Sequence, residues 1–187
     1  MMVIQLLQGV WGMDGWVTWL EGLRGAYEAR MRAMCAVLEA NTHTTVSRDL
    51  DGDGDDDEQA AIIDKREMYS FHTPEAGMFV WVHIHITSHP AYSSYLSRDP
   101  KHTKREMMTK LWGYTAERHS CLSCPGWVFA PDQVSLEDGA AERLRLCFAA
   151  IEEGTVVDAS ERFCKGVREF WEMTAEEIER CCKSPEL

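Results

Sequence analysis

The chain has 187 residues, a length that fits one domain of ordinary size. Apolar residues make up 45% and charged residues 27% of it, which is the composition of a globular domain rather than of a disordered or fibrous chain. Acidic residues outnumber basic ones by 31 to 19, and the net charge of −12 argues against nucleic acid as a partner, because phosphate binding needs a basic surface. We also expect no membrane partner, because no apolar run approaches the roughly 18 residues of a membrane-spanning helix.

Seven cysteines are scattered along the sequence. The apolar N-terminus, residues 1–8, carries no Lys or Arg and no small-residue cleavage site of the kind found in secretory signals. An odd number of dispersed cysteines without such a signal is typical of reduced thiols. We therefore expect a cytoplasmic protein without a disulfide framework.

The first part of the sequence, residues 1–40, predicts helices that lead into a domain. The segment Trp11–Gly15 separates a short apolar helix from a long one, with Asp14 as the expected N-cap. Apolar residues then recur at steps of three and four, which predicts a helix of about seven turns with one apolar face. The members of this stripe are Trp16, Leu20, Leu23, Tyr27, Met31, Met34 and Leu38.

Residues 41–64 are polar and rich in Gly and Asp, and we interpret them as an acidic surface loop inserted into the domain. The segment Asp49–Gly54 matches the first six positions of a calcium-binding EF-hand loop, but position twelve, which should be a bidentate Glu, is Ala60. Because dense runs of like charge usually stay solvated, we favour a loop without calcium, and we expect the fold to tolerate deletion of residues 49–58.

The remaining residues, 65–187, show the patterns of short strands and helices, and we assign them to a single domain. The predicted strands span residues 69–71, 78–86 and 143–149, and the predicted helices span residues 103–119 and a final segment opened by a capping box at Thr155. Turns at Thr73–Gly77 and Cys124–Gly126 separate these elements. This order predicts an α+β fold, with a small, mostly antiparallel sheet covered by helices and preceded by a long helix.

Two groups of residues raise the alternative of a metal-binding protein. His83 and His85 are expected on one face of a strand, and Cys121 and Cys124 form a CxxC pair. A structural zinc site usually needs two such pairs at compatible spacing. We favour partly exposed histidines and buried thiols, and we expect no metal ligands.

Arg145 is the residue best suited to hold a ligand. It alternates along its strand with Leu144 and Leu146, so packing of the opposite face is expected to fix the backbone. An Arg fixed in this way presents a planar fork of N–H donors that fits a carboxylate. From this residue alone, however, an exposed strand Arg without a function is the more frequent case.

Four segments resemble, in the same order, the C-terminal small domain of fungal class I/II pyridoxal-phosphate-dependent aminotransferases of the aromatic amino acid and 2-aminoadipate type. Together they extend over residues 1 to about 172. The segments are WLEGLRGAYEAR (Trp19–Arg30), TPEAGMFVW (Thr73–Trp81), CPGWVF (Cys124–Phe129) and RLCFA (Arg145–Ala149). They are similar to the helix that enters that domain, to its P-x-x-A-G-M-F-x-W strand, to its P-G-x-x-F turn and to its R-L-S/C-F-A strand.

The resemblance implies a fold, a substrate class and a role for one residue. The fold would be that of the small domain of a fold type I pyridoxal-phosphate-dependent transferase. In that family the strand Arg binds the α-carboxylate of an amino acid or 2-oxo acid substrate, so Arg145 takes that role by resemblance. The turns at Gly77 and at Pro125–Gly126 would line the substrate cleft as scaffold.

The resemblance also implies that parts of the site lie elsewhere. The family's cofactor, pyridoxal phosphate, forms a Schiff base with a Lys in a Ser-rich segment upstream of the matched part, and no Lys of this chain has that context. The lysines are Lys65, Lys101, Lys104, Lys110, Lys165 and Lys183. We therefore expect no catalytic and no cofactor-binding residues in this chain, no covalently bound pyridoxal phosphate, and no transamination by the chain alone.

Two roles follow from this combination of matches and departures. The chain is either a fragment, from a truncated gene model, a split gene or a remnant, that supplies Arg145 to a site completed by a large-domain partner or in a homodimer, or a non-catalytic interaction module that binds the large domain of a relative. The apolar residues among positions 1–10 are compatible with both, because such a surface should be covered by other sequence.

Overall fold

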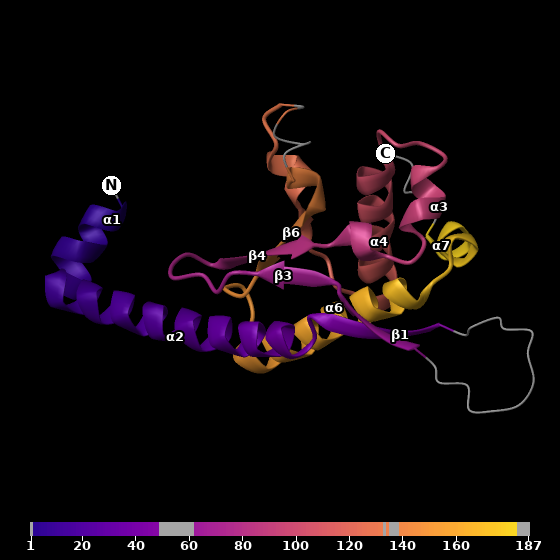
Figure 1. Ribbon diagram of the computed structural model, residues 1–187. Coiled ribbons are helices and arrows are strands. Elements are labelled where there is room, and N and C mark those ends of the chain that lie inside the picture. Colours follow the sequence, from indigo (N-terminus) through magenta and orange to yellow (C-terminus); the bar gives the residue numbers. More distant parts are fainter. Residues whose placement is uncertain (1, 49–61, 133, 135–138, 183–187) are drawn as a thin grey trace, which may run out of the picture.

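The computed structural model describes residues 2–48, 62–132, 134 and 139–182 (Figure 1). The helices are α1 (Met2–Gln5), the π-helix η1 (Leu6–Trp11), α2 (Gly12–Ala40), α3 (Tyr92–Leu96), α4 (Thr103–His119), α6 (Glu153–Glu172) and α7 (Ala175–Cys181). The strands are β1 (His43–Arg48), β2 (Ile62–Glu67), β3 (Tyr69–Phe71), β4 (Phe79–Ile84), β5 (Cys124–Pro125) and β6 (Arg143–Cys147). Short 3-10 turns are η2 (Ile86–Ser88), η3 (Gly126–Phe129) and η4 (Ala140–Glu142).

A four-stranded antiparallel sheet with the order β3-β4-β6-β5 forms the centre of the molecule. On one face, Val80 lies opposite Leu146 and Val82 lies opposite Leu144, and all four side chains are buried. The alternate residues of both strands point to the other face, which remains partly open. The predicted α+β fold, with a small antiparallel sheet, helices over it and a long helix before it, is confirmed.

Helices cover the apolar face of this sheet. Figure 1 shows α2 and α6 running below the sheet, and α4 packs against α6 at one end. The buried residues of α6 recur at helical spacing, among them Phe163, Val167 and Phe170, each fully buried. Complete burial of such a side chain contributes about 1.5–3 kcal/mol, so this helix is a main source of the fold's stability.

Only the C-terminal half of α2 joins the core. Met34 and Leu38 are buried, whereas Trp19 and Leu20 are 44% and 41% exposed. Figure 1 shows the N-terminal half of α2, together with α1, extending beyond the sheet and the other helices. The predicted apolar stripe therefore does lie on one helix, but only its C-terminal half packs against the core. No helix within the described residues is both long and apolar enough to cross a membrane.

The expected N-cap of the long helix was wrong. The helix begins at Gly12 and Asp14 lies in its first turn, where no side-chain cap is formed. The interruption between the two helices comes instead from Gly12. Its φ of +65°, a conformation that favours glycine, ends the preceding π-helix.

The predicted loop over residues 41–64 is wrong at both ends. β1 and β2 pair in antiparallel register from His43 opposite Glu67 to Arg48 opposite Ile62. The strands were hidden because their polar composition resembles a loop, and because pairing across the acidic run cannot be read from either strand alone. Residues 49–58 lie outside the described residues, so the calcium-free loop stays a prediction.

The capping box was predicted at the wrong helix. α6 begins at Glu153, which places Thr155 inside its first turn rather than at the N-cap. A capping box does occur at Thr174, where the hydroxyl accepts from the backbone N–H of Glu177 and the Glu177 carboxylate accepts from the backbone N–H of Thr174. This box opens α7, which the sequence reading missed because the helix is only seven residues long.

Candidate functional site

Arg145 lies in the middle of the central strand β6, between the neighbouring strands β4 and β5. Its register partners are Trp81 on one side and Cys124 on the other. Leu144 and Leu146, which flank it in sequence, are 0% and 6% exposed. The two ladders and the packed opposite face fix the backbone at this residue, and the Arg145 side chain stands half-buried on the partly open face.

Two aromatic rings hold the guanidinium group of Arg145. Its central carbon lies 4.0 Å from the centroid of the Phe79 ring and 4.5 Å from that of Phe129. The Phe129 ring in turn meets Trp81 edge-on at 5.5 Å. A cation over such ring faces is stabilised by about 0.5–2 kcal/mol, depending on its exposure to solvent. Within the described residues, Arg145 forms no ion pair and no hydrogen bond, so its N–H donors are available to a ligand.

Gly126 explains how Phe129 reaches Arg145. A Cβ atom at Gly126 would lie 2.4 Å from the carbonyl oxygen of Ala140 and 3.0 Å from the Cβ of Arg143. Only glycine therefore lets η3 pass so close to the start of β6, and this close passage brings Phe129 over the sheet. The Pro125–Gly126 turn thus supports the surroundings of Arg145, rather than contributing a polar group of its own.

Arg143 and His83 occupy the same face as Arg145 but are placed differently. Arg143 is exposed and lies opposite His83 in the ladder. The rings of His83 and His85 lie with their centroids 5.0 Å apart, although His85 directly follows the end of β4. Burial, followed by the nearby His85, lowers the pKa of His83. The described residues contain no group of three or more His, Cys, Asp or Glu side chains arranged to hold a metal ion.

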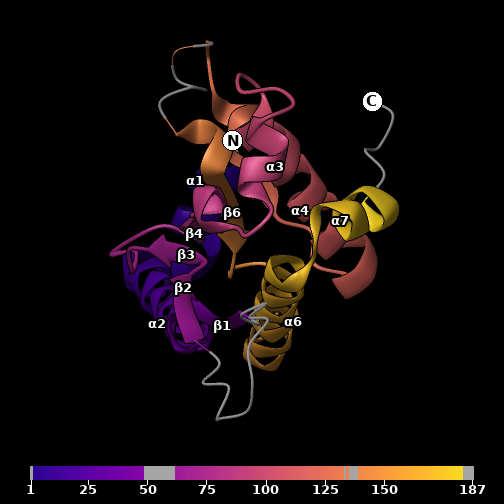
Figure 2. The same cartoon turned by 45° about the vertical axis from the view of Figure 1, so that its right-hand side comes forward.

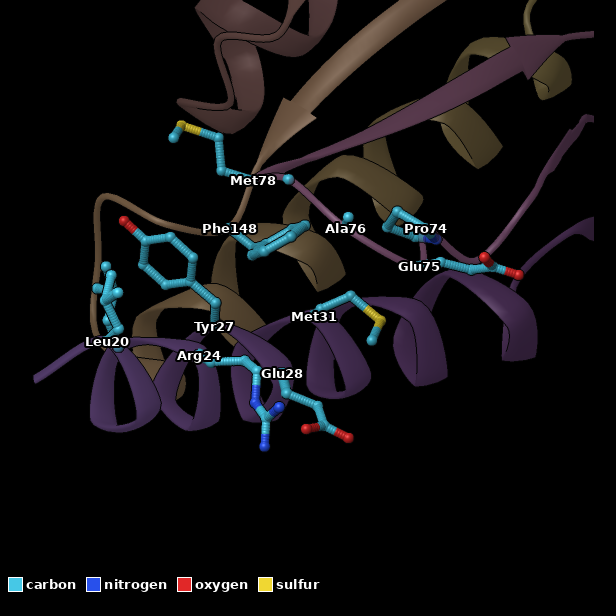
Figure 3. A pocket seen from close by; sticks show the side chains of 12 residues that line it. Leu20, Arg24, Tyr27, Glu28, Met31, Pro74, Glu75, Ala76, Met78 and Phe148 are labelled. Carbon is cyan, nitrogen blue, oxygen red and sulfur yellow. The ribbon is translucent and has the colours of Figure 1, made fainter. Parts of the chain in front are cut away.

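A cavity of about 840 Å³ lies between α2 and the turn that precedes β4 (Figure 3). Figure 3 shows Tyr27 and Phe148 side by side in this cavity, and their rings meet edge-on at 6.4 Å. Arg24 and Glu28 extend to the opposite side of the helix from Tyr27. The other lining residues are Leu20, Leu23, Met31 and residues 74–78.

The turns at Gly77 and at Pro125–Gly126, which the resemblance implied to line one cleft, do not line this cavity together. Gly77, with φ of +90°, lies in the turn that lines the cavity, whereas Pro125–Gly126 and Arg145 do not line it. The cavity wall is mostly apolar, and among the described residues its charged members are Arg24, Glu28 and Glu75. This cavity is therefore a poor candidate for binding a small carboxylate.

Two cavities in the described part of the chain lack a lysine that could hold pyridoxal phosphate covalently. A Schiff base requires an amine that opens into the ligand site, and no described lysine lines the cavity beside α2 or a second cavity of about 520 Å³ near the end of α6. Lys104 and Lys110 are instead paired with Glu142 at 2.8 Å and Glu179 at 3.0 Å. No chemical step is therefore assigned to a cofactor in this chain.

Sequence reasoning missed the aromatic contacts of Arg145. Phe79 and Phe129 stand in the quoted segments, but no role was given to either. One signal was available for Phe79: with Trp81 it alternates with the buried Val80 and Val82, which places it on the face of Arg145. No local pattern predicts the position of Phe129, because it depends on the close approach of Gly126 to β6.

Comparison with known proteins agrees with this architecture. No protein-family model matches the chain. The aminotransferase swnA of Metarhizium robertsii is 29% identical over 98 residues, which are 52% of this chain and 15% of that protein. The L-tyrosine:2-oxoglutarate aminotransferase atrD of Tapinella panuoides is 27% identical over 82 residues, 44% of this chain and 12% of that protein.

Solved structures extend the similarity to nearly the whole fold. The aminotransferase Aro8 from Candida albicans matches with a TM-score of 0.60 and 24% identity over 90% of this chain and 30% of its own length. The chain thus spans less than a third of the proteins that it resembles. It is similar to aminotransferases in sequence over about half of its length, and it has the α+β fold of an aminotransferase C-terminal domain.

Proposed function

We propose that this chain is the substrate-carboxylate-binding domain of an aminotransferase, in which Arg145 binds the α-carboxylate of an amino acid or 2-oxo acid. The observation that carries the proposal is the state of Arg145. The residue is fixed on a central strand, held by the rings of Phe79 and Phe129, and free of any carboxylate partner among the described residues. A half-buried guanidinium without an anion is poised for a charge-assisted, two-pronged hydrogen bond.

The remainder of the active site would come from a large domain or from a second subunit. Two observations support this part of the proposal. No described lysine lines either cavity, so the amine that holds the cofactor has to be supplied from elsewhere. The end of η1 and the N-terminal half of α2 also present exposed apolar residues that a partner would cover, namely Val10, Met13, Val17, Trp19 and Leu20.

A second candidate function is a non-catalytic module that binds the large domain of a relative. The same exposed face of α2 favours it, because association needs this surface but does not need Arg145. The two candidates differ in one respect: only the first predicts that the chemistry of Arg145 matters.

The test uses a chimera in which residues 1–172 replace the corresponding part of Candida albicans Aro8. If the chimera transaminates, Arg145→Lys is expected to raise the amino-acid KM and to lower kcat/KM by a factor on the order of ten to a hundred, because loss of a charge-assisted pair removes about 1.5–3 kcal/mol. Lys keeps the charge but cannot reproduce the planar fork, so the loss reports geometry.

Arg143→Lys is the matched control, because Arg143 lies on the same strand and the same face but is exposed and contacts neither Phe79 nor Phe129. This control should change kcat/KM less than Arg145→Lys does. Equal or larger damage from Arg143→Lys would move the carboxylate role to that residue. An active chimera that is indifferent to both changes would leave the interaction module as the better account.

A further inference from the structure

Three sulfur atoms meet near the C-terminal end of the described chain, far in sequence from Arg145. The Sγ atom of Cys181 lies 3.6 Å from the Sδ atom of Met173 and 3.4 Å from the Sγ atom of Cys182. Met173 directly follows α6, and the two cysteines end α7. The nearest other polar partner of Cys181 is the carbonyl oxygen of Ile178, at 4.0 Å. Sulfur is therefore the dominant ligand atom of this cluster.

The surrounding structure holds the cluster in place. Thr174, which follows Met173, opens the capping box of α7. Ile178 is fully buried, and Glu179 pairs with Lys110 of α4 at 3.0 Å and with Arg98 at 3.2 Å. Figures 1 and 2 show α7 beside α3 and α4, where these contacts anchor it. The backbone from Met173 to Cys181 is thus positioned before any ligand arrives, which reduces the entropic cost of binding.

The cluster is reachable from one side. Cys182 is 4% exposed, but Cys181 and Met173 are half-buried. Met173 also lines the cavity of about 520 Å³ that lies between the end of α6 and residues 90–94. An ion can therefore approach the thioether and the Cys181 thiol without unfolding α7.

The charged groups near this cluster do not balance the negative charge of two thiolates. Burial and the neighbouring Cys181 raise the pKa of the Cys182 thiol to about 12, although the charge of Lys110 acts in the opposite direction. Lys110 is itself already paired with Glu179. A bound cation would provide the charge that stabilises the two cysteines as thiolates.

The ligand set selects the kind of cation. Thiolate and thioether sulfurs are soft ligands that favour Cu(I), whereas calcium and magnesium require oxygen. Zinc usually takes four Cys, His or carboxylate ligands, and the described residues contain no such group here. With metal–sulfur bonds of about 2.3 Å, three sulfurs in a plane stand about 4 Å apart. The distances from the Cys181 sulfur to those of Met173 and Cys182, 3.6 and 3.4 Å, would each lengthen by only about half an ångström.

We propose that Met173, Cys181 and Cys182 form a three-sulfur site for one soft monovalent cation of the Cu(I) type. Binding releases the two thiol protons to solvent and leaves the metal oxidation state unchanged, so no oxidant or reductant is consumed. The bound site carries one net negative charge. The proposal is independent of the carboxylate role of Arg145.

The experiment titrates the full chain, under anaerobic conditions, with Cu(I) supplied as its coloured bicinchoninate complex. The wild-type chain should withdraw one tight equivalent of Cu(I). Cys181→Ser and Cys182→Ser should each weaken that equivalent by a factor of at least ten. Met173→Leu, which conserves volume, should weaken it less and should reduce the sulfur neighbours of copper, measured by X-ray absorption, from three to two.

The matched control is the double variant Cys121→Ser/Cys124→Ser, which removes the other close pair of cysteines in the sequence and should leave the tight equivalent unchanged. Circular dichroism checks the fold of each variant. If the buried change Cys182→Ser unfolds the chain, the half-exposed Cys181→Ser decides. The three-sulfur site would be overturned if the wild-type chain withdrew no Cu(I), or if Cys181→Ser still bound the tight equivalent. It would also be overturned if the control variant lost the tight equivalent, or if Met173→Leu kept three sulfur neighbours around copper.

Discussion

The guanidinium of Arg145 is held by ring faces rather than by a carboxylate, and this distinction matters for its proposed role. An intramolecular Asp or Glu would compete with an incoming carboxylate for the same N–H donors. Phe79 and Phe129 restrain the group through their faces and leave the donor edges free. The arrangement reduces the side-chain entropy that would be lost on binding and does not occupy the site.

Removing one of these rings tests the restraint. In the active chimera, Phe79→Leu should lower kcat/KM by a factor of about 2 to 30, which corresponds to the roughly 0.5–2 kcal/mol of a cation–ring contact. Phe79→Tyr keeps the ring face and should retain most of the activity. Steady-state kinetics with one amino acid at varied concentration would decide. Equal activity of the Leu and Tyr variants would show that the ring does not position Arg145.

His89 makes the stability of the fold depend on pH. It is 2% exposed, its Nε2–H donates to the Phe170 carbonyl at 2.8 Å, and its Nδ1 accepts from the backbone N–H of Ala91 at 3.0 Å. Burial lowers the pKa of His89 to about 4, because the imidazolium form would lose its hydration. The residue is therefore a neutral link between the end of α6 and the segment before α3.

The sign of the pH effect follows from proton binding. Between pH 6.5 and 4 the unfolded chain binds a proton at His89 and the folded chain does not. The contribution of neutral His89 to the free energy of unfolding is therefore complete above pH 6.5 and is lost as the pH falls toward 4. The slope is about 1.4 kcal/mol per pH unit, or about 3 kcal/mol in all. Urea denaturation of the wild type and of His89→Gln from pH 4.5 to 7 checks this, and identical pH profiles would contradict it.

Among the secondary-structure elements, those with a strong period were predicted and those that depend on distant contacts were not. The helix over residues 103–119 has the predicted bounds, and β4 and β6 lie within the predicted strands, because their apolar residues repeat at the period of helix or strand. β1 and β2 were missed because each is short and polar, and gains its stability from pairing with a strand beyond the acidic run.

The candidate site divides in the same way. Arg145 could be predicted because its strand alternates with buried leucines and because the surrounding motif is similar to a known family. Its contact with Phe129 could not, since it requires η3 to pass within van der Waals contact of η4 and β6 at Gly126. Sequence reading thus proposes Arg145 as the charged group of the candidate site, and tertiary packing supplies the rings that orient it.

The capping box of α7 provides a test at the level of a single helix. Thr174→Ala removes the hydroxyl that accepts the backbone N–H of Glu177 and should reduce the free energy of unfolding by about 1 kcal/mol. Thr174→Ser keeps the hydroxyl and should lose much less. Urea denaturation at neutral pH measures both. A loss of similar size in both variants would mean that the methyl group, rather than the cap, stabilises α7.

At the scale of the whole molecule, the core and the N-terminal half of α2 behave differently. The sheet and the C-terminal helices enclose a continuous apolar core, while the first half of α2 presents Trp19 and Leu20 to solvent. The side chains of Trp11, Trp16 and Trp19 stack on one another there, with Trp16 and Trp19 centroids 5.0 Å apart. In the proposed function, a large domain or a second subunit covers this face.

The purified chain should not transaminate by itself. With pyridoxal phosphate and an amino-acid/2-oxo-acid pair it should show no turnover, and borohydride reduction should not fix the cofactor to one specific lysine. The reason is that no described lysine lines either cavity and that Lys104 and Lys110 are engaged by carboxylates. Turnover accompanied by a single modified lysine, located by mass spectrometry, would refute this expectation.

The carboxylate role of Arg145 is tested most directly by a crystal structure of the active chimera with an unreactive carboxylic acid analogue of the substrate bound. We expect two guanidinium nitrogens of Arg145 to lie about 2.7–2.9 Å from the two carboxylate oxygens, with the group still resting on Phe79 and Phe129. A carboxylate bound to another residue, with Arg145 unchanged between its two rings, would contradict the proposed role.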